Sequence, residues 1–344
     1  MTEPSPIGVG VLGTADIAWR RTVPAIMACD RLRLAAVASR TPEKAGAFAD
    51  RFGGAAVTGY QRLLARDDVQ AVYVALPNSL HEQWADAALR AGKHVLVEKS
   101  LTVDAAAAVR LADTARAAGL ALVENFAFLD HPQHGWVRER IAEGAIGDVR
   151  VVSASFGVPQ ADRGLIRYSR ELAGGALRET GCYPVRLAAS LLGPDVEVVG
   201  ARLRDDPDIG VDVSGSALLA DSAGVTAQCD FGLAHAYRNT YAVWGSAGRI
   251  EVDWAFTPPP GARPVVRLHQ ADTVTEHRLP AADQFLLMVG DFAEACVEPT
   301  RRDEHRSAIV GQATLLEAVV RLSDATPSTT SRAGRPGGHH VTVA

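Results

Sequence analysis

The chain has few cysteines, and none of them is spaced to form a redox pair or to hold a metal. Cys29, Cys182, Cys229 and Cys296 lie far apart, with no CxxC motif and no histidine at metal-ligand spacing. We therefore expect a reduced, cytoplasmic protein with no metal site.

Long apolar runs and an excess of positive charge are missing as well. No run approaches the roughly 18 apolar residues that a membrane helix needs, and the opening "MTEPSP" lacks the basic and apolar parts of a signal segment. A formal net charge of −5 argues against a nucleic-acid partner bound by bulk electrostatics. With 344 residues, 47% of them apolar, the chain is typical of a globular protein with two domains.

The first part of the chain alternates short apolar runs with segments of helical spacing. The apolar runs, which read as strands, lie at 7–12, 33–39, 71–76, 94–99 and 120–125. Strand and helix in repeated alternation predict right-handed βαβ units. We therefore predict an α/β protein whose residues 1–125 form a doubly wound parallel sheet.

The pattern changes beyond about residue 145. Helical stretches are expected only at about 175–192 and 281–322, and turns such as "DSAG", "GSAG" and "PPPG" separate the remaining segments. These segments, which read as strands, lie at 149–157, 195–203, 211–219, 224–231, 237–244, 248–253, 264–269 and 273–278. They predict an α+β domain at 126–325 with a large, mostly antiparallel, open-faced sheet. The Gly- and Pro-rich residues 326–344 are expected to be a flexible tail.

A glycine-containing loop follows the first strand. A literal GxGxxG at Gly8, Gly10 and Gly13 falls inside the strand, whereas a phosphate loop must follow a strand and open a helix. In the shifted, degenerate register Gly13 makes the tight turn, and the next residues offer backbone N–H groups to a pyrophosphate. The alternative is an ordinary turn. The predicted cofactor-binding residues here are Gly13, Thr14, Ala15, Asp16 and Ile17.

The second strand ends in Ser39-Arg40, where an acidic residue would bind the ribose of NAD. A hydroxyl followed by a guanidinium suits a 2′-phosphate, since arginine forms bidentate contacts with phosphate. Ser39 and Arg40 therefore indicate NADP(H), unless Arg40 is a solvated surface charge.

The next strand ends in "ALPNSLH", which delivers polar groups to the carboxyl edge of the sheet, where ligands of open α/β folds bind. Leu76, Pro77, Asn78 and His81 are predicted cofactor contacts. For His81 the alternative is packing at a helix N-terminus.

The strand "HVLVEK" finishes on Glu98 and Lys99, an acid and a base at the same edge, where a nicotinamide would lie. Both are predicted cofactor contacts. A lysine there, beside a desolvated substrate, is expected to have its pKa lowered toward neutrality and to act as a general acid toward a carbonyl oxygen. The alternative is a solvated ion pair that closes the strand. Asn125, which ends a further strand, is expected to contact the nicotinamide or its ribose.

The segment 174–193 combines helical spacing with residues that weaken a helix. Gly181 and Pro184 flank Tyr183, and such costs are tolerated where side chains must be aimed at a ligand. Tyr183 is a candidate second proton donor or substrate anchor, and the alternative is an aromatic residue of the core or of an interface.

These motifs occur together in order, and the combination resembles the glucose-fructose oxidoreductase / inositol dehydrogenase (Gfo/Idh/MocA) family over roughly residues 5–325. Within it, "ADIAWRRTVPAI" and "DFGLAHAYRN" look most like the NADP-dependent C-3-ketoreductases of dideoxysugar biosynthesis. The resemblance implies a Rossmann domain, with Lys99 as the lysine of the family's Glu-Lys-Pro motif and Tyr183 as its Tyr/His position. It also shows two departures: Ser100 replaces a proline whose bond is cis in the family, and Glu179 replaces an aspartate that would bind a sugar hydroxyl.

The resemblance implies reduction of a C-3 keto group on a dTDP-linked deoxysugar by NADPH, with Lys99 and Tyr183 at the developing alkoxide. The loop 158–170 supplies Arg163 and Arg167 as candidates for the substrate diphosphate, unless that loop is merely solvated. Two other functions stay open: an NADP-dependent dehydrogenase of a free sugar, polyol or trans-dihydrodiol, and a non-catalytic NADP-binding regulator. A homo-oligomer, dimer or tetramer, is expected because this fold commonly pairs its exposed sheet faces.

Overall fold

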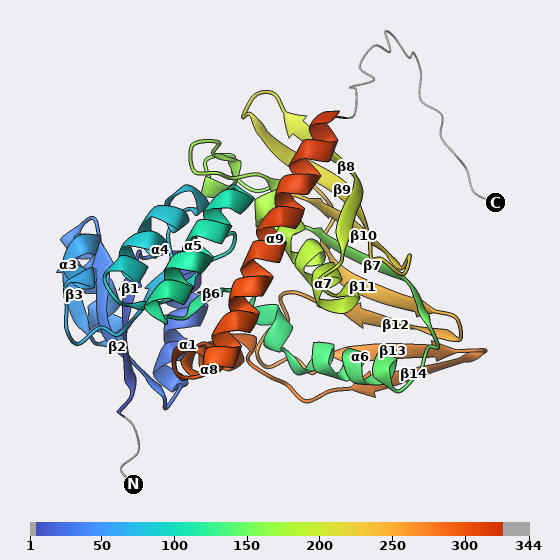
Figure 1. Ribbon diagram of the computed structural model, residues 1–344, viewed down its shortest axis with the longest axis horizontal. Coiled ribbons are helices and arrows are strands. Elements are labelled where there is room, and N and C mark those ends of the chain that lie inside the picture. Colours follow the sequence, from blue (N-terminus) through green and yellow to red (C-terminus); the bar gives the residue numbers. More distant parts are fainter. Residues whose placement is uncertain (1–4, 326–344) are drawn as a thin grey trace.

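The computed structural model describes residues 5–325, which form two sheets side by side with helices around them (Figure 1). The predicted tail at 326–344 lies outside the described residues. The first sheet is six-stranded and parallel, in the order β3-β2-β1-β4-β5-β6, so the strand order reverses between β1 and β4. Its strands are β1 (Ile7–Leu12), β2 (Leu32–Ser39), β3 (Ala55–Thr58), β4 (Ala71–Val74), β5 (His94–Val97) and β6 (Leu122–Glu124).

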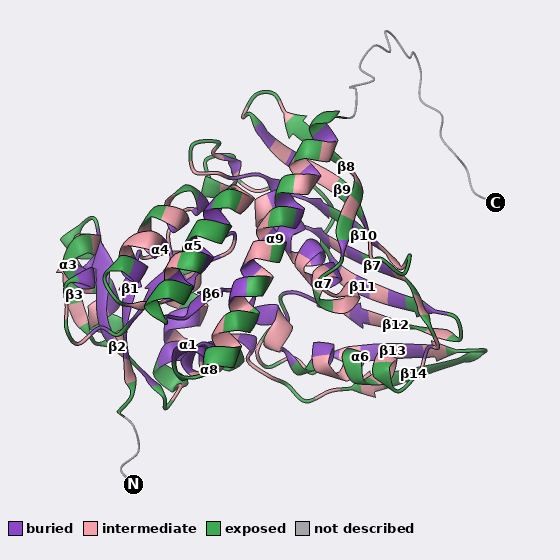
Figure 2. Ribbon diagram, viewed as in Figure 1, coloured by how far each residue is buried: buried purple, intermediate pink, exposed green. Residues whose placement is uncertain are grey.

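Helices cover both faces of this sheet, and its central strands are therefore apolar to their ends. One face packs against α1 (Val23–Ala28), α2 (Pro42–Phe52) and α8 (Gln284–Val297). The other packs against α3 (Tyr60–Leu64), α4 (His81–Arg90), α5 (Ala105–Ala118) and the buried Ile309 of α9 (Pro299–Ala325). Figure 2 shows the buried strands between these helices. The predicted boundary at residue 125 stays a prediction, but α8 and part of α9 pack with the first sheet.

The second sheet is eight-stranded, in the order β14-β13-β12-β11-β7-β10-β9-β8. It is antiparallel except where β10 pairs with β7. The prediction of a mostly antiparallel sheet is thereby confirmed. One face carries a core that includes α7 (Cys182–Leu192), and the other is open, with Trp244 63% exposed. The strands are β7 (Val149–Gly157), β8 (Glu197–Asp206), β9 (Val211–Ala220), β10 (Thr226–Gly232), β11 (Arg238–Gly245), β12 (Gly248–Asp253), β13 (Val265–Gln270) and β14 (Thr273–Arg278).

Several elements differ from the sequence prediction. The prediction omits strand β3, which is short, lies at the sheet edge and has no buried residue. It also omits helix α6 (Pro132–Ala142), because two of the three buried side chains of this helix, Gln133 and His134, are polar. The single helix expected at 281–322 is two helices, interrupted before Pro299.

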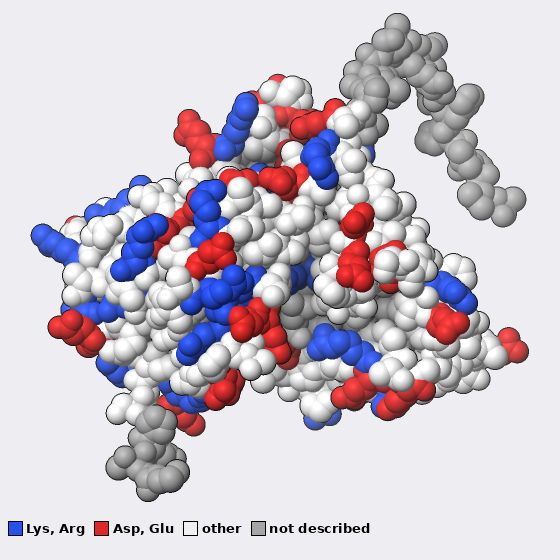
Figure 3. Space-filling model, viewed as in Figure 1, with Lys and Arg blue, Asp and Glu red and all other residues white. Residues whose placement is uncertain are grey.

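In the described part of the chain no helix is both long and apolar enough to cross a membrane. On the face drawn in Figure 3, acidic and basic side chains are interspersed.

Candidate active site

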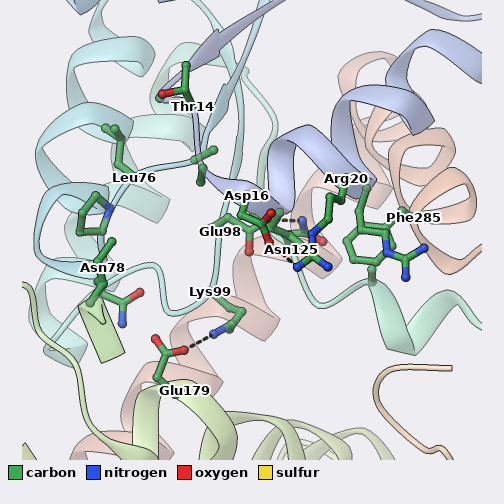
Figure 4. A pocket seen from close by; sticks show the side chains of 18 of the residues that line it. Thr14, Asp16, Arg20, Leu76, Asn78, Glu98, Lys99, Asn125, Glu179 and Phe285 are labelled. Atoms are coloured by element: carbon green, nitrogen blue, oxygen red, sulfur yellow. Dashed lines mark hydrogen bonds and ion pairs between the residues drawn. The ribbon is translucent and has the colours of Figure 1, made fainter. Parts of the chain in front are cut away.

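A cavity of about 1130 Å³ opens at the carboxyl edge of the parallel sheet and takes its walls from both halves of the molecule. Figure 4 shows the side chains that converge there from the strand ends of the first sheet and from the segment that holds Glu179. The predicted site residues that line it are Gly13, Thr14, Ala15, Asp16, Ile17, Ser39, Arg40, Leu76, Pro77, Asn78, Glu98, Lys99, Asn125, Arg167, Glu179 and Tyr183.

The loop after β1 has the geometry of a phosphate loop. Gly13 has φ +99°, and a Cβ there would lie 2.2 Å from the carbonyl oxygen of Ala75, so only glycine fits. Its N–H donates to the carbonyl of Ala38 at 3.0 Å, which holds the turn against β2. Thr14 and Ala15 follow on the cavity wall, directly before the first helix. The loop thus fits a dinucleotide pyrophosphate.

The end of β2 offers hydroxyls and cations, without an acidic residue. Ser39 is buried, and its Oγ accepts from the Thr41 N–H at 3.4 Å. Arg40 and Lys44 are exposed, and both line the cavity. Burial raises the pKa of the nearby Tyr60, and the Arg40 charge opposes that rise. This set fits a 2′-phosphate. The sequence prediction omits Lys44, although it lies in the first turn of the helix that "TPEK" begins.

Two predicted contacts do not reach the cavity. His81 is buried, with Nδ1 2.8 Å from the carbonyl oxygen of Ser100 and Nε2 2.7 Å from that of Leu76. It therefore holds the backbone on either side of the site and does not line it. Arg163 pairs with Asp206 at 2.8 Å and with Asp208 at 3.8 Å, outside the lining residues. Acidic residues at and beyond the end of β8 engage this guanidinium.

Glu98 lies one residue beyond β5, whose last residue is Val97, and it is the centre of a buried network. Its Oε1 accepts from the Tyr73 hydroxyl at 2.6 Å and from Asn125 Nδ2 at 2.7 Å. Burial raises the pKa of Glu98, while the hydrogen bond from Tyr73 and the Lys99 charge oppose the rise. The Tyr73 hydroxyl also lies 3.1 Å from Thr22 Oγ1, so the network reaches the first helical segment. Glu98 is thus fixed beside Lys99.

Lys99 forms an ion pair with Glu179, with Nζ 3.8 Å from Oε2 (Figure 4). Burial lowers the pKa of Lys99, but the negative charge of the Glu179 carboxylate outweighs it and raises the pKa above the usual value. The prediction that this pKa is lowered toward neutrality is therefore wrong. The sequence could not reveal the rise, because no local pattern places Glu179 beside Lys99. The Lys99–Ser100 peptide bond is cis.

Tyr183 lies beside Lys99, whose Nζ is 5.6 Å from the centre of its ring. The weakened helix of the sequence is here a π-turn, η5 (Leu177–Gly181), followed by α7. A Cβ on Gly181 would lie 2.8 Å from the Phe231 ring, so glycine lets this turn approach the second sheet. Burial raises the pKa of Tyr183, which keeps its hydroxyl protonated.

Other wall residues carry no signal in the sequence. Phe128 and Phe256 pack around the Tyr183 ring at 5.8 and 5.7 Å between ring centres. Phe285 reaches the cavity from α8, which lies far along the chain. Arg20 and Arg21 also line it, from a π-turn, η1 (Ala18–Thr22). Arg20 and Arg21 follow the phosphate loop directly in the sequence, whereas only the three-dimensional fold brings the three phenylalanines to it.

Comparison with known proteins matches both halves of the chain. Residues 7–126 match the model described as "Oxidoreductase family, NAD-binding Rossmann fold", and residues 134–251 match the "GFO/IDH/MocA C-terminal domain". The chain belongs to the Gfo/Idh/MocA oxidoreductase family. The family resemblance of the motifs is thereby confirmed.

Relatives of this Gfo/Idh/MocA protein cover nearly its whole length. It is 49% identical to dTDP-3,4-didehydro-2,6-dideoxy-alpha-D-glucose 3-reductase of Actinomadura kijaniata, over 92% of this chain and 95% of that one. It is 35% identical to D-xylose 1-dehydrogenase (NADP(+)) 2 of Haloferax volcanii, over 88% and 93%. The crystal structure of KijD10, a 3-ketoreductase from Actinomadura kijaniata in complex with NADP and TDP-benzene, superposes with a TM-score of 0.89 at 48% identity, covering 92% of this chain and 98% of that one.

Proposed function

We propose that this protein reduces the C-3 keto group of a dTDP-linked deoxysugar with NADPH. The observation that carries the proposal is the Lys99–Glu179 ion pair beside Tyr183, in the cavity that also holds the phosphate loop and Arg40. Identity of 49% to a dTDP-sugar 3-reductase, over almost the whole chain, supports this substrate class.

Some residues of the site bind the cofactor, and others stabilise and protonate the ketone oxygen of the substrate. Gly13, Thr14 and Ala15 cradle the pyrophosphate of the cofactor, and Ser39 and Arg40 take its 2′-phosphate. NADPH, when bound, supplies the hydride that C-3 receives.

Lys99 donates a hydrogen bond to the ketone oxygen and stabilises the negative charge that develops there. Its side chain is 13% exposed, so the charge acts with little screening by water. The proton that completes the alcohol comes from Lys99 or from the Tyr183 hydroxyl and is replaced from solvent. Glu179 keeps Lys99 protonated until that step.

We propose also that the protein is cytoplasmic and forms a homo-oligomer through the open face of its second sheet. Exposed apolar side chains there, such as Trp244 and Leu218, support such an assembly.

Steady-state oxidation of NADPH tests the proposal, with a dTDP-3-keto-6-deoxysugar made in situ by a dehydratase. NADH and free sugars are run beside it. Turnover with NADPH and the nucleotide sugar alone is expected. NADP-dependent oxidation of a free sugar or diol, without turnover of the nucleotide sugar, would contradict it.

A further inference from the structure

We propose that Arg21, with Arg20 beside it, binds the diphosphate of the nucleotide-linked substrate on the wall of the cavity formed by η1 and α8. The inference rests on the proposed function, because it presumes a substrate with a diphosphate. It replaces the expectation that Arg163 and Arg167 in the loop 158–170 do this work.

The cations of the cavity wall have different partners. Lys99 pairs with Glu179, and Arg20 pairs with Asp16. The two cations at the end of β2 are placed for the 2′-phosphate of the cofactor. Two further guanidinium groups line the cavity, those of Arg21 and Arg167, and neither has a hydrogen bond or ion pair to another residue that the structure describes.

An unpaired, half-buried guanidinium in a cavity is suited to an anionic ligand. Arg21 is partly buried, so part of its hydration is already lost before any ligand arrives. A guanidinium binds phosphate oxygens in bidentate fashion, and this bond is stronger where water is partly excluded. Arg21 therefore has the chemistry of a diphosphate ligand.

The wall formed by η1 and α8 begins directly after the phosphate loop and extends past Lys99. In Figure 4, Thr14, Leu76 and Asn78 lie on one side, Arg20 and Phe285 lie on the opposite side, and Lys99 projects between them. Of the predicted cofactor contacts, Thr14, Leu76 and Asn78 lie on the first side, and Asp16 and Asn125 lie near the centre. A substrate whose ketone meets Lys99 can therefore extend its remaining groups toward the second side, where η1 contacts α8.

The last residue of η1, Thr22, is anchored in the protein interior, next to Arg21. Thr22 is fully buried, and its Oγ1 lies 3.1 Å from the hydroxyl of Tyr73, which donates a hydrogen bond to Glu98. Single π-turns within helices are frequent at functional sites. Because Thr22 is anchored in the network beside Lys99, binding at Arg21 requires little ordering of the protein.

Arg167, the rival candidate, belongs to the other wall. Its carbonyl accepts from the Gly175 N–H at 2.9 Å, and Asn78 Nδ2 donates to the neighbouring Ala173 carbonyl at 3.0 Å. The Arg167 backbone is thereby tied to the side of Asn78. We assign Arg167 to the cofactor side and Arg21 to the substrate.

Calorimetric titration of dTDP into the NADP-loaded protein tests the assignment. In Arg21→Gln the Kd for dTDP is expected to rise at least about tenfold, while the Kd for NADPH changes less than about twofold. Arg163→Gln, outside the lining residues, is the matched control and should bind dTDP as the wild type does. Arg167→Gln, compared at saturating NADP, should weaken dTDP binding less than Arg21→Gln does. Arg21→Lys, which keeps the charge, should fall between Arg21→Gln and wild type, and it serves if Arg21→Gln does not fold.

Unchanged dTDP affinity in Arg21→Gln would overturn the inference, and so would a loss in Arg167→Gln as large as that in Arg21→Gln. Weakened NADPH binding in Arg21→Gln in place of weakened dTDP binding would do the same, by moving Arg21 to the cofactor. In each case the proposed function stands, because the wild type still binds dTDP. A wild-type protein that binds NADP but no dTDP would instead refute the proposed function itself.

Discussion

At the scale of single residues, the charge of Lys99 depends on Glu179. The pKa of Lys99 is raised, so the proton donor persists through alkaline pH, and activity should fall only as pH rises through that high pKa. Glu179→Gln removes the main cause of the rise and leaves burial, which lowers the pKa. We therefore expect the basic limb of the kcat/KM profile to move down by at least about one pH unit in Glu179→Gln. A basic limb at the same pH in both proteins would show that Glu179 does not control Lys99.

Lys99 itself should be needed for turnover and not for binding of the cofactor. Lys99→Met is expected to lower kcat by about 10²- to 10⁴-fold, the usual contribution of a positioned acid, with the Kd for NADPH little changed. Lys93→Met is the control, since Lys93 Nζ bonds the Arg66 and Val69 carbonyls away from the cavity. Normal turnover in Lys99→Met would contradict this role of Lys99. No turnover in the wild type despite NADPH binding would favour the non-catalytic regulator.

Arg40 should determine the choice of cofactor. Arg40→Ala is expected to raise the KM for NADPH about tenfold to a hundredfold, the loss of a charged hydrogen bond or two. The KM for NADH should stay the same, because NADH has no 2′-phosphate. Arg90→Ala is the control, since Arg90 pairs with Asp86 on an exposed helix face. Equal rises with both cofactors would contradict the assignment.

At the scale of elements, the turn before η5 depends on a glycine. Gly175 has φ +116°, and a Cβ there would lie 2.1 Å from Oδ1 of Asp212, whose Oδ2 accepts from the Leu177 N–H at 2.6 Å. Gly193 also has positive φ, at +93°, but a Cβ there meets nothing within 4 Å. Alanine substitutions at these two glycines therefore separate the cost of backbone strain from the cost of displacing the Asp212 side chain.

Gly193→Ala should lower the free energy of unfolding by about 1–2 kcal/mol, the cost of positive φ. Gly175→Ala should cost about 1–3 kcal/mol more, because it also disturbs the Asp212 bond, and it should raise the KM for the sugar substrate. Urea unfolding and steady-state kinetics measure both effects. Equal stability losses in the two variants would show that Asp212 does not hold this turn.

The sequence predicts those parts of the site that depend on local residue patterns, and it does not predict those that depend on tertiary contacts. The strand ends carry local signals, so the residue pattern alone is enough to place Gly13, Arg40 and Lys99 at one edge of the sheet. The two π-turns could not be predicted, because each needs tertiary contacts: Thr22 with Tyr73, and Gly181 with the ring of a strand residue. The aromatic residues of the cavity wall depend on tertiary contacts of the same kind. The pairing of Lys99 with Glu179 depends on them as well.

At the scale of the whole molecule, α8 and α9 join the two sheets. Arg302, near the start of α9, donates to the carbonyls of Ala295 and Cys296 in α8 and to that of Gly119 after α5. Further along α9, Leu315 and Leu316 belong to the core of the second sheet. Two successive helices therefore link the two sheets whose residues form the cavity walls, although these residues come from distant parts of the sequence.

We propose that a hydride passes from NADPH to C-3 of a nucleotide-linked keto-sugar in this cavity. Product analysis by mass spectrometry and NMR, after turnover with NADPH that carries deuterium at its transferable position, tests that claim directly. We expect a dTDP-sugar alcohol with one deuterium, located at C-3. A product with deuterium at another carbon, or an unchanged nucleotide sugar while NADPH remains bound, would contradict it.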